Sequence, residues 1–470
     1  MRGVDVFAIR LTAEPGQATR AVLVDAAGTP LGGDDEVAAW CRTEDDPGRA
    51  GAARVLPRPL RTPAKLVVAG LGADDYRAAG AAVVAAVGRD EEVQLEVPAG
   101  ATPEQVRDLA EGIWFAGYRF AEAPEGPRTA AVDLITNADG YADSLAAAES
   151  VARAVWLARD LTNMPSSVKN PAWFAGRVVA EAATRPGLSV TVREPEQLAA
   201  EGFGGIMAVG GGSATPPRLV ELRWAPEGAT KHVVLVGKGI TFDTGGISIK
   251  TRDGMKLMKK DMGGAAAVIG ATLAAADLRL PVRVTALTPL AENAVSGSAY
   301  RPGDVITHYD GSTSESTNSD AEGRLVLADA LGYAIAELAP DVVIDLATLT
   351  GANSVALGKS MAALYSHDDD LAAALVRAGV AAGEHMWRMP LPDDYTEYLR
   401  SDIADRHSSP SQGAGSVVAA LYLRDFLGDK AGSWAHFDMS APSWSDKTAG
   451  DLVKGATGWG VRMLVRYLSA

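Results

Sequence analysis

The chain has 470 residues, of which 47% are hydrophobic and 22% charged, and its formal net charge is −15 at pH 7. This composition is typical of a globular protein and excludes a disordered or fibrous chain, while the length predicts two or three domains of roughly 150 residues each. Because an acidic surface repels DNA and anionic membranes, the charge disfavours nucleic acid as a partner.

Short, largely β-branched runs alternate with helical patterns over the first third of the chain. Turn residues bound each run, which predicts strands at residues 21–25, 65–69, 93–97 and 131–136. Helices are expected at residues 74–87 and 102–123, the second with Pro103 at a first helical position. This alternation indicates a small α/β domain, to which we assign residues 1–140.

A helical pattern runs without interruption from residue 141 to residue 163 and is stopped by Met164 and Pro165. We interpret residues 141–165 as a helix that connects two domains.

After this helix the alternation resumes, and we assign residues 166–470 to a larger C-terminal domain. Three strongly apolar runs predict strands at the centre of a buried sheet. The fold class expected is therefore α/β, with two domains that are each a sheet flanked by helices. The central strands are predicted at residues 232–236, 283–287 and 341–346, further strands at 189–193 and 218–224, and helices at 172–183, 196–201, 264–276 and 323–338.

Cysteine content and targeting patterns narrow the setting of the protein. Cys41 is the only cysteine, which excludes an intrachain disulfide bond and a cysteine-rich zinc site. Residues 1–5 lack the basic-then-apolar pattern of a signal peptide. The apolar run at residues 265–276 is too short to span a bilayer. We therefore expect a cytoplasmic protein with no membrane partner.

Charged residues gather after the predicted strand 232–236 and before the predicted helix 323–338, and α/β sheets place their sites at the carboxyl ends of strands. Carboxylates bridge two divalent cations well, and a lysine joins them only as the neutral amine. A remaining lysine and an arginine are suited to stabilise an anionic intermediate. The cluster consists of Lys238, Asp243, Lys250, Asp261, Asp320, Glu322 and Arg324.

Each part of this cluster also has an ordinary structural interpretation. Ser319 and Glu322 have the spacing of a capping box, which taken alone is favoured over metal binding. Gly237 and Gly239 only weakly suggest a phosphate loop, because the third glycine and the Lys-Ser/Thr ending are missing. The sequence contains no His-Glu-x-x-His motif and no Gly-x-Ser-x-Gly elbow, so neither a histidine zinc site nor a serine hydrolase is supported.

Residues 318–325, NSDAEGRL, closely resemble the signature octapeptide of the leucyl aminopeptidase family, which comprises hexameric, dinuclear metallo-aminopeptidases. Ser319 stands where threonine is usual. Four further segments are similar to the family in order and spacing: RDLTNMP from Arg159, GKGITFD from Gly237, MKKDMGG from Met258 and LATLTG from Leu346. The resemblance is strong over residues 159–351, fair as far as residue 468 and weak over the first 150 residues.

The resemblance implies a dinuclear centre and an aminopeptidase that releases N-terminal residues, with leucine-like ones preferred, from peptides. One ion would be held by Lys238, Asp243, Asp261 and Glu322. The other would be held by Asp243, Asp320, Glu322 and the backbone carbonyl of Asp320. Such carboxylate-rich sites accept Zn²⁺ or Mn²⁺ depending on supply.

The same resemblance implies roles for the residues around the ions and for the assembly. Lys250 would polarise the scissile carbonyl, and Arg324 would anchor a bicarbonate ion that relays a proton. The substrate pocket would be lined by Met258, Asn318, Thr348 and Gly351. The family's assembly implies a homohexamer.

Two segments depart from the family pattern. Residues 439–442, MSAP, stand where the family usually has Ile/Leu-Ala-Gly-Pro, and residues 406–408, RHS, replace a segment that usually contains asparagine. These differences leave side-chain preference and subunit contacts open. Two other classes remain as alternatives: a DNA-binding accessory protein, against which the charge argues, and a catalytically inactive relative, against which Lys250 and Arg324 argue.

Overall fold

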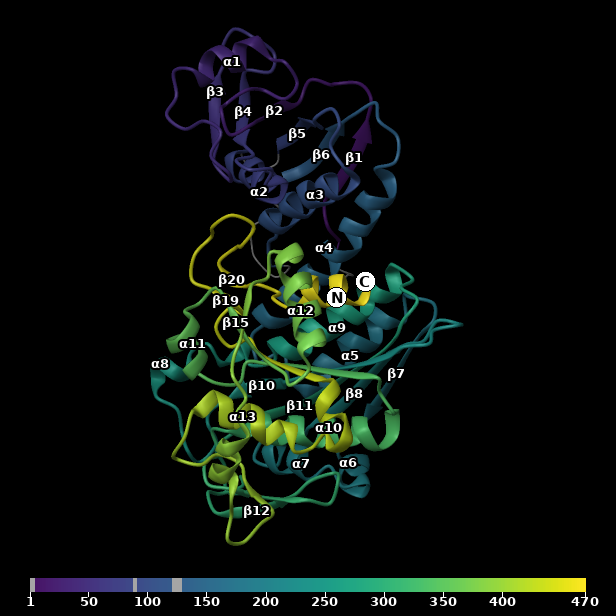
Figure 1. Ribbon diagram of the computed structural model, residues 1–470, viewed down its shortest axis with the longest axis vertical. Coiled ribbons are helices and arrows are strands. Elements are labelled where there is room, and N and C mark those ends of the chain that lie inside the picture. The colour runs from purple at the N-terminus through teal and green to yellow at the C-terminus, as the bar shows by residue number, and fades with distance from the viewer. Residues whose placement is uncertain (1–4, 88–90, 121–128) are drawn as a thin grey trace. The chain divides into compact units, whose positions relative to one another are not determined.

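The computed structural model describes residues 5–87, 91–120 and 129–470, which divide into two compact units (Figure 1). The first unit comprises Met1–Trp156 and Ser445–Gly455, and the second comprises Leu157–Trp444 and Ala456–Ala470. The expectation that the chain has no signal peptide was drawn from residues 1–5, and residues 1–4 lie outside the described residues. The predicted long helix is confirmed as α4 (Ala142–Asn163), and the division between the units falls within it.

The sheet of the first unit has six strands in the order β1-β6-β5-β2-β4-β3. All neighbouring pairs are parallel except β3 and β4. The four strands predicted in this part of the chain are confirmed as β2, β4, β5 and β6. The strand bounds are β1 (Ala8–Thr12), β2 (Thr19–Val24), β3 (Ala53–Pro57), β4 (Lys65–Gly70), β5 (Glu91–Glu96) and β6 (Thr129–Ile135).

Helices cover both faces of this sheet. Val37 and Cys41 of α1 (Asp35–Cys41) pack on one face, against Val22 and Val24 of β2. The side chain between Val22 and Val24 points to the opposite face of the sheet, because side chains alternate along a strand. On that side α2 (Tyr76–Ala86) and α3 (Pro103–Gly117) pack on each other.

The predicted helix 102–123 is shorter in the structure. It ends at Gly117, and Tyr118 leaves the helix with φ −56° and ψ 139°. The buried ring of Tyr118 packs edge-on against Trp156, with 5.5 Å between the ring centroids. This long-range aromatic contact, which helix propensity does not encode, accompanies the early end. Residues 121–123 of the predicted helix lie outside the described residues.

A cavity of about 550 Å³ lies at the carboxyl ends of β2, β5 and β6, within the first unit. Its walls are largely apolar, with Leu31 and Ile135 among them. Two polar groups in the lining are already engaged: Glu96 pairs with Arg20 at 3.0 Å, and the Tyr141 hydroxyl donates to the Ala101 carbonyl at 2.7 Å. None of the residues that line this cavity belongs to the charged cluster.

The second unit is built on a nine-stranded sheet. Its path is β16-β15-β18-β14-β9-β11-β8-β7, and β10 pairs with β11. The central strands β18, β14, β9 and β11 are parallel, which confirms the buried sheet centre predicted from the apolar runs. The bounds are β7 (Leu188–Arg193), β8 (Arg218–Trp224), β9 (His232–Gly237), β10 (Gly239–Asp243), β11 (Arg283–Asn293), β14 (Val342–Ala347), β15 (Ala362–Tyr365), β16 (Met386–Arg388) and β18 (Trp434–Asp438).

Helices also cover both faces of the larger sheet. On one face α9 packs with α14 and α5, and on the other α10 packs with α7 and α13 (Figure 1). Three of these helices, α5, α9 and α10, were predicted from sequence. The helices are α5 (Pro171–Ala182), α6 (Pro195–Glu201), α7 (Gly204–Gly210), α8 (Arg252–Met255), α9 (Gly263–Asp277), α10 (Glu322–Leu338), α11 (Ala352–Leu357), α12 (Asp369–Ala382), α13 (Gly415–Arg424) and α14 (Val461–Leu468), with 3₁₀ turns η1 (Met258–Lys260), η2 (Asp393–Leu399) and η3 (Gly428–Ser433).

Small sheets complete the fold. Three strands form the sheet β12-β13-β17, and two more form a short pair. Their bounds are β12 (Asp304–Thr307), β13 (Thr313–Ser316), β17 (Arg406–His407), β19 (Trp444–Ser445) and β20 (Gly455–Ala456). Across the described ranges, no helix combines the length and the hydropathy needed to cross a membrane.

Candidate metal centre

The charged cluster lies at the carboxyl edge of the parallel strands. Lys238 follows β9, Asp243 ends β10, and Thr348 follows β14. Because β9, β14 and β11 are parallel, their carboxyl ends lie at one edge of the sheet, where α/β proteins place their sites. Asp320 and Glu322 reach the same place from the start of α10.

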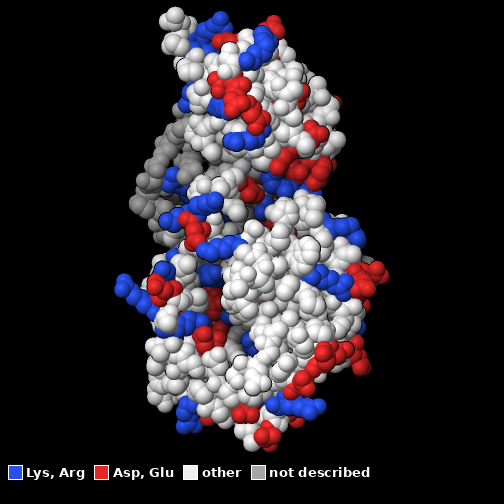
Figure 2. All heavy atoms as spheres, turned by 60° about the vertical axis from the view of Figure 1, so that its left-hand side comes forward, with Lys and Arg blue, Asp and Glu red and all other residues white. Residues whose placement is uncertain are grey.

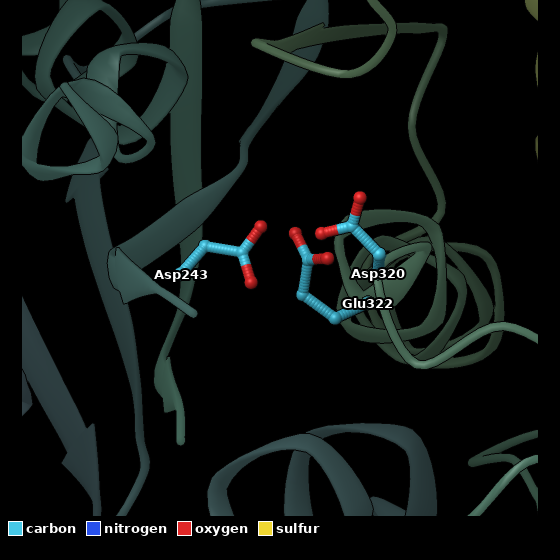
Figure 3. Close-up of side chains that lie close together, drawn as sticks. All are labelled: Asp243, Asp320 and Glu322. Carbon is cyan, nitrogen blue, oxygen red and sulfur yellow. The ribbon is translucent and has the colours of Figure 1, made fainter. Parts of the chain in front are cut away.

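Three of the predicted carboxylates converge. Oxygen atoms of Asp243, Asp320 and Glu322 lie within 4.8 Å of one another, and Figure 3 shows the three side chains directed toward a common centre. Asp243 and Glu322 are each 1% exposed. Carboxylates gathered this closely repel one another unless cations lie between them.

Lys238 joins this group from the other side. Its Nζ lies 2.9 Å from Asp261 Oδ2 and 2.9 Å from Glu322 Oε1, and it donates to the Thr348 carbonyl at 3.0 Å. The side chain is 3% exposed, so it is not the surface lysine that its type alone would favour. Burial opposes the charge of Lys238, but Asp261, Glu322 and Asp243 together raise its pKa above the ordinary value.

Lys250 occupies the more open side of the cluster. Its Nζ lies 2.7 Å from Asp243 Oδ2 and also pairs with Asp320. Burial lowers its pKa, but the carboxylates of Asp243 and Glu322 outweigh burial and raise it. Lys250 therefore stays protonated and keeps its hydrogen-bond donors.

Burial also raises the pKa of carboxyl groups in the cluster. Desolvation, reinforced by the charge of Asp243, raises the pKa of Glu322 to about 8. Burial also raises the pKa of Asp261 and of Asp320. Glu322 Oε2 has no hydrogen-bond partner among the described residues. When all four carboxyl groups are ionised, the two lysines compensate only two of the four negative charges, so this oxygen-rich donor set fits divalent cations.

Glycines allow the backbone to close around Lys238. A Cβ on Gly264, at the start of α9, would lie 2.0 Å from the Leu346 carbonyl oxygen. A Cβ on Gly323, in the first turn of α10, would lie 2.5 Å from Cε of Lys238. Neither position leaves room for a larger residue, so these two glycines set how closely the helices approach the lysine.

Asn293, which the sequence did not single out, supports the cluster, and so does the predicted pocket residue Thr348. Asn293, the last residue of β11, donates to Asp243 Oδ1 at 2.8 Å and to the Ser319 carbonyl at 2.9 Å. The Thr348 hydroxyl donates to Asp261 Oδ1 at 2.7 Å. Asn293 could have been found from its place at the carboxyl end of a predicted central strand, had that strand been extended to its true length.

The capping-box interpretation of Ser319 and Glu322 is wrong. Helix α10 has Ala321 at its N-cap and no side-chain cap. Ser319 Oγ instead donates to the Gly245 carbonyl at 2.7 Å and accepts from the Ser248 amide at 2.7 Å. Ser319 therefore ties the start of α10 to the loop after β10, and Glu322 is free to face the cluster.

Arg324 lies in the first turn of α10 and is 8% exposed. It donates from Nη1 to the Ser408 carbonyl at 2.7 Å, and its Nε has no acceptor among residues that the structure describes. Burial lowers the pKa of the guanidinium, although nearby Tyr422 and Glu322 oppose this. A buried guanidinium with an open donor is suited to bind an anion.

Of the four residues predicted to line a substrate pocket, Met258 and Asn318 lie close in sequence to the cluster. Met258 begins the 3₁₀ turn before Asp261, and Gly351 precedes α11. Asn318 accepts a hydrogen bond from the Asp320 amide at 2.9 Å. Thr348 contacts Asp261, as described above. Of the four, the structure thus ties Asn318 and Thr348 directly to carboxylate residues of the cluster.

A second polar group has the hydrogen-bond order of a Ser-His-Asp triad. His308 Nε2 lies 2.9 Å from Ser314 Oγ, and its Nδ1 lies 2.9 Å from Asp329 Oδ1. However, Ser314 is fully buried and its hydroxyl is also 2.8 Å from that of Tyr422. Asp329 accepts a further bond from the Ile206 amide at 2.8 Å. This network therefore fixes α10 in the core and offers no nucleophile to a substrate.

Charge on the protein surface is mixed. Figure 2 shows acidic and basic side chains interspersed over one face, and no extended basic area appears there among the residues that the structure describes. This face offers no continuous site for a nucleic-acid backbone.

Comparisons with known proteins agree with this geometry. The model of the cytosol aminopeptidase family, catalytic domain, matches residues 156–465. The chain is 41% identical over 455 residues to a probable cytosol aminopeptidase of Geobacter sulfurreducens, which covers 92% of this chain and 91% of the relative.

Solved structures are similar over almost the whole chain. The bottromycin maturation enzyme BotP in complex with Mn superposes with a TM-score of 0.88 at 38% identity, covering 97% of this chain and 99% of that one. A tomato leucine aminopeptidase mutant superposes with a TM-score of 0.86 at 30% identity, covering 98% and 96%. These matches confirm the predicted α/β fold class.

Proposed function

The chain belongs to the cytosol aminopeptidase family, and on that premise we propose that it releases N-terminal amino acids, leucine-like ones preferred, from peptides by two-metal hydrolysis. The observation that carries this proposal is the convergence of Asp243, Asp320 and Glu322 within 4.8 Å, beside the buried Lys238 and the partly buried Lys250. We assign catalysis to the C-terminal domain, residues 166–470, connected through residues 141–165 to the N-terminal domain, residues 1–140.

The donor set divides between two cation positions. One is assigned to Lys238, Asp243, Asp261 and Glu322, and the other to Asp243, Asp320, Glu322 and the Asp320 backbone carbonyl. Zn²⁺ or Mn²⁺ suits such ligands, and the Mn complex of BotP supports this choice. Two bound divalent ions would supply Lewis acidity toward a carbonyl and would lower the pKa of a bound water molecule.

Lys238 serves this centre only as the neutral amine, because coordination needs the nitrogen lone pair. The neighbouring carboxylates raise its pKa, and the ammonium pairs with Asp261 and Glu322. Cations at the same carboxylates reverse that field and favour loss of the proton. The ion pair and the ligand role are therefore two states of one residue.

Lys250 and Arg324 are assigned the stabilisation of developing negative charge. Lys250 is protonated and partly open to solvent, so it can donate to the scissile carbonyl of a bound peptide. Arg324 keeps an open Nε donor in the first turn of α10. We assign to it a bicarbonate ion, whose oxygens accept from a guanidinium and can carry a proton.

Side-chain preference is assigned to Met258, Asn318, Thr348 and Gly351. The segment at residues 439–442, which departs from the family pattern, adjoins these residues, because Ser440 Oγ donates to the Thr350 carbonyl at 2.6 Å. Leucine-like residues are proposed from the similarity to the tomato leucine aminopeptidase. The differences at residues 439–442 would be the source of any preference for another N-terminal side chain.

Removal of metal is expected to abolish hydrolysis. The full-length protein dialysed against a chelator should lose cleavage of leucyl amide substrates, and added Mn²⁺ or Zn²⁺ should restore it. N-acetylated versions of the same substrates should resist the restored enzyme, since an aminopeptidase requires a free α-amino group. Full activity after exhaustive chelation would refute the two-metal proposal.

The assembly is expected to be a homohexamer in the cytoplasm, as in the family that the sequence resembles. Six chains of 48.7 kDa give about 290 kDa for a closed symmetric assembly. Light scattering at micromolar concentration measures this mass directly. A monomer under those conditions would contradict the expected assembly without affecting the metal assignment.

A further inference from the structure

Two lysines join the turn before Asp261 to the carboxyl end of α4. Lys169 Nζ donates to the Lys259 carbonyl at 2.5 Å and to the Thr162 carbonyl at 3.2 Å. Lys259 Nζ donates to the Asn163 carbonyl at 2.8 Å. We call Lys169 and Lys259 the lysine clamp. The carbonyl groups of Thr162 and Asn163 belong to the last turn of α4.

The end of α4 needs such donors. The last carbonyls of a helix have no partner within the helix, and the helix dipole makes this end attractive to cations. The last turn of α4 contains no basic residue of its own. The lysine clamp therefore satisfies the end of α4 from other segments, and in doing so it couples α4 to the turn η1.

Lys169 is fully buried, and its third contact is Met262 Sδ at 3.0 Å. Burial, together with the charge of Lys259, holds the pKa of Lys169 well below its ordinary value. The two carbonyl acceptors need two N–H groups, and both protonation states of the amine supply them. The contacts consequently persist in either state, and their loss would leave buried carbonyls unsatisfied.

The turn held in this way carries a proposed metal ligand. Asp261 follows Lys259 by two residues, and its amide donates to the Met258 carbonyl at 3.1 Å. Its carboxylate contacts Lys238 at 2.9 Å and Thr348 at 2.7 Å. Asp243 and Asp320, by contrast, come from β10 and from the start of α10 and not from this turn.

We propose that the lysine clamp positions Asp261 and thereby sets the affinity of the cation position formed with Lys238. The inference rests on the proposed function, since it concerns one of the two metal positions. Lys169 and Lys259 are positioning residues in this scheme. They hold the backbone that aims Asp261, and no role in contacting substrate is assigned to them.

The test is a titration of metal-stripped, full-length protein with Mn²⁺, in which calorimetry measures each binding step. Lys169→Met keeps the length and apolar stem of the side chain but removes its donors. We expect one of two binding steps to weaken about 10–100-fold, as is typical when a residue that orients a ligand is lost, while the other step is unchanged. Excess Mn²⁺ should then return kcat toward the wild-type value.

Two further variants separate positioning from loss of folding. Lys259→Met removes the hydrogen bond to Asn163 and the cation–π contact with Trp444, keeps Lys169 in place, and should weaken the same step by a smaller factor. Lys256→Met is the matched control, because Lys256 is exposed and pairs with Asp253 at the surface; both steps should stay as in the wild type. If Lys169→Met does not fold by circular dichroism, Lys259→Met decides the question.

The outcomes that overturn the inference are distinct. Folded clamp variants with two unchanged binding steps would refute it, and equal weakening of both steps would show a general loosening instead. A wild-type chain that binds no Mn²⁺ would refute the proposed function itself. The first two results concern the clamp variants and the third concerns the wild-type chain, so failure of the inference can be told from failure of the proposed function.

Discussion

Replacing Lys238 with arginine is expected to leave one metal ion per chain instead of two and to remove almost all turnover. Arginine is protonated at all ordinary pH values and offers no lone pair, so it cannot coordinate a cation. It also places a fixed positive charge where Asp261 and Glu322 would bind the ion. The position formed by Asp243, Asp320 and Glu322 should remain filled.

The rival explanation is a permanent buried ion pair. In that case Lys238→Arg keeps the charge, and the variant binds as many ions as the wild type. Lys238→Met adds a second contrast: loss of the ammonium should strengthen cation binding if the lysine only neutralises carboxylates, and weaken it if the lysine is a ligand. The two explanations therefore differ in metal count and in the sign of an affinity change.

Elemental analysis after dialysis measures the metal count, with melting temperature as a check that the variants fold. This check is needed because Gly323 packs against the Lys238 stem and leaves little space for arginine. The matched control is Lys256→Arg, a conservative change at an exposed lysine. Two ions per chain with wild-type turnover in Lys238→Arg would remove Lys238 from the ligand set.

Replacing Arg324 with alanine is expected to lower kcat about 10²–10³-fold while both metal ions stay bound. Loss of one donor to a developing anion typically has an effect of this size. Among the residues that the structure describes, Arg324 pairs with no carboxylate of the cluster, and its guanidinium donates to the Ser408 carbonyl. Its removal should therefore affect the reaction more than the metal positions.

Steady-state kinetics and elemental analysis on the same preparation test this expectation. Arg301→Ala is the matched control, because Arg301 is exposed and pairs with Asp304 three residues away. A decrease in metal content parallel to kcat would assign Arg324 to metal retention. An unchanged kcat would remove it from the reaction altogether.

Local patterns determined much of this protein. The apolar runs at residues 232–236, 283–287 and 341–346 predicted β9, β11 and β14, because strands buried on both faces are continuously apolar. The charged residues at their carboxyl ends predicted where the cluster would lie, since parallel strands end at one edge. Both inferences depend only on order and spacing along the chain.

Long-range packing decided the rest. Ser319 and Glu322 satisfy a local capping rule, yet Ser319 bonds to Gly245 and Ser248, more than 70 residues away, and α10 begins without that cap. Likewise Tyr118 ends α3 beside Trp156 against the local helical tendency. Where a distant partner offers a better contact than the local one, short-range rules give the wrong answer.

Asn293 and Lys169 show the same limit at the candidate site. Asn293 lies beyond the predicted end of its strand at residue 287, and nothing near Lys169 in sequence distinguishes it from a surface lysine. Asn293 becomes a support of Asp243, 50 residues earlier, and Lys169 a donor to a turn 90 residues later, only when the sheet is assembled. The sequence by itself determined the central strands and several of the long helices, because these follow from local periodicity, and its motif predicted the types of ligand. The tertiary structure alone decided which buried donors hold those residues, because that depends on contacts between segments far apart in the chain.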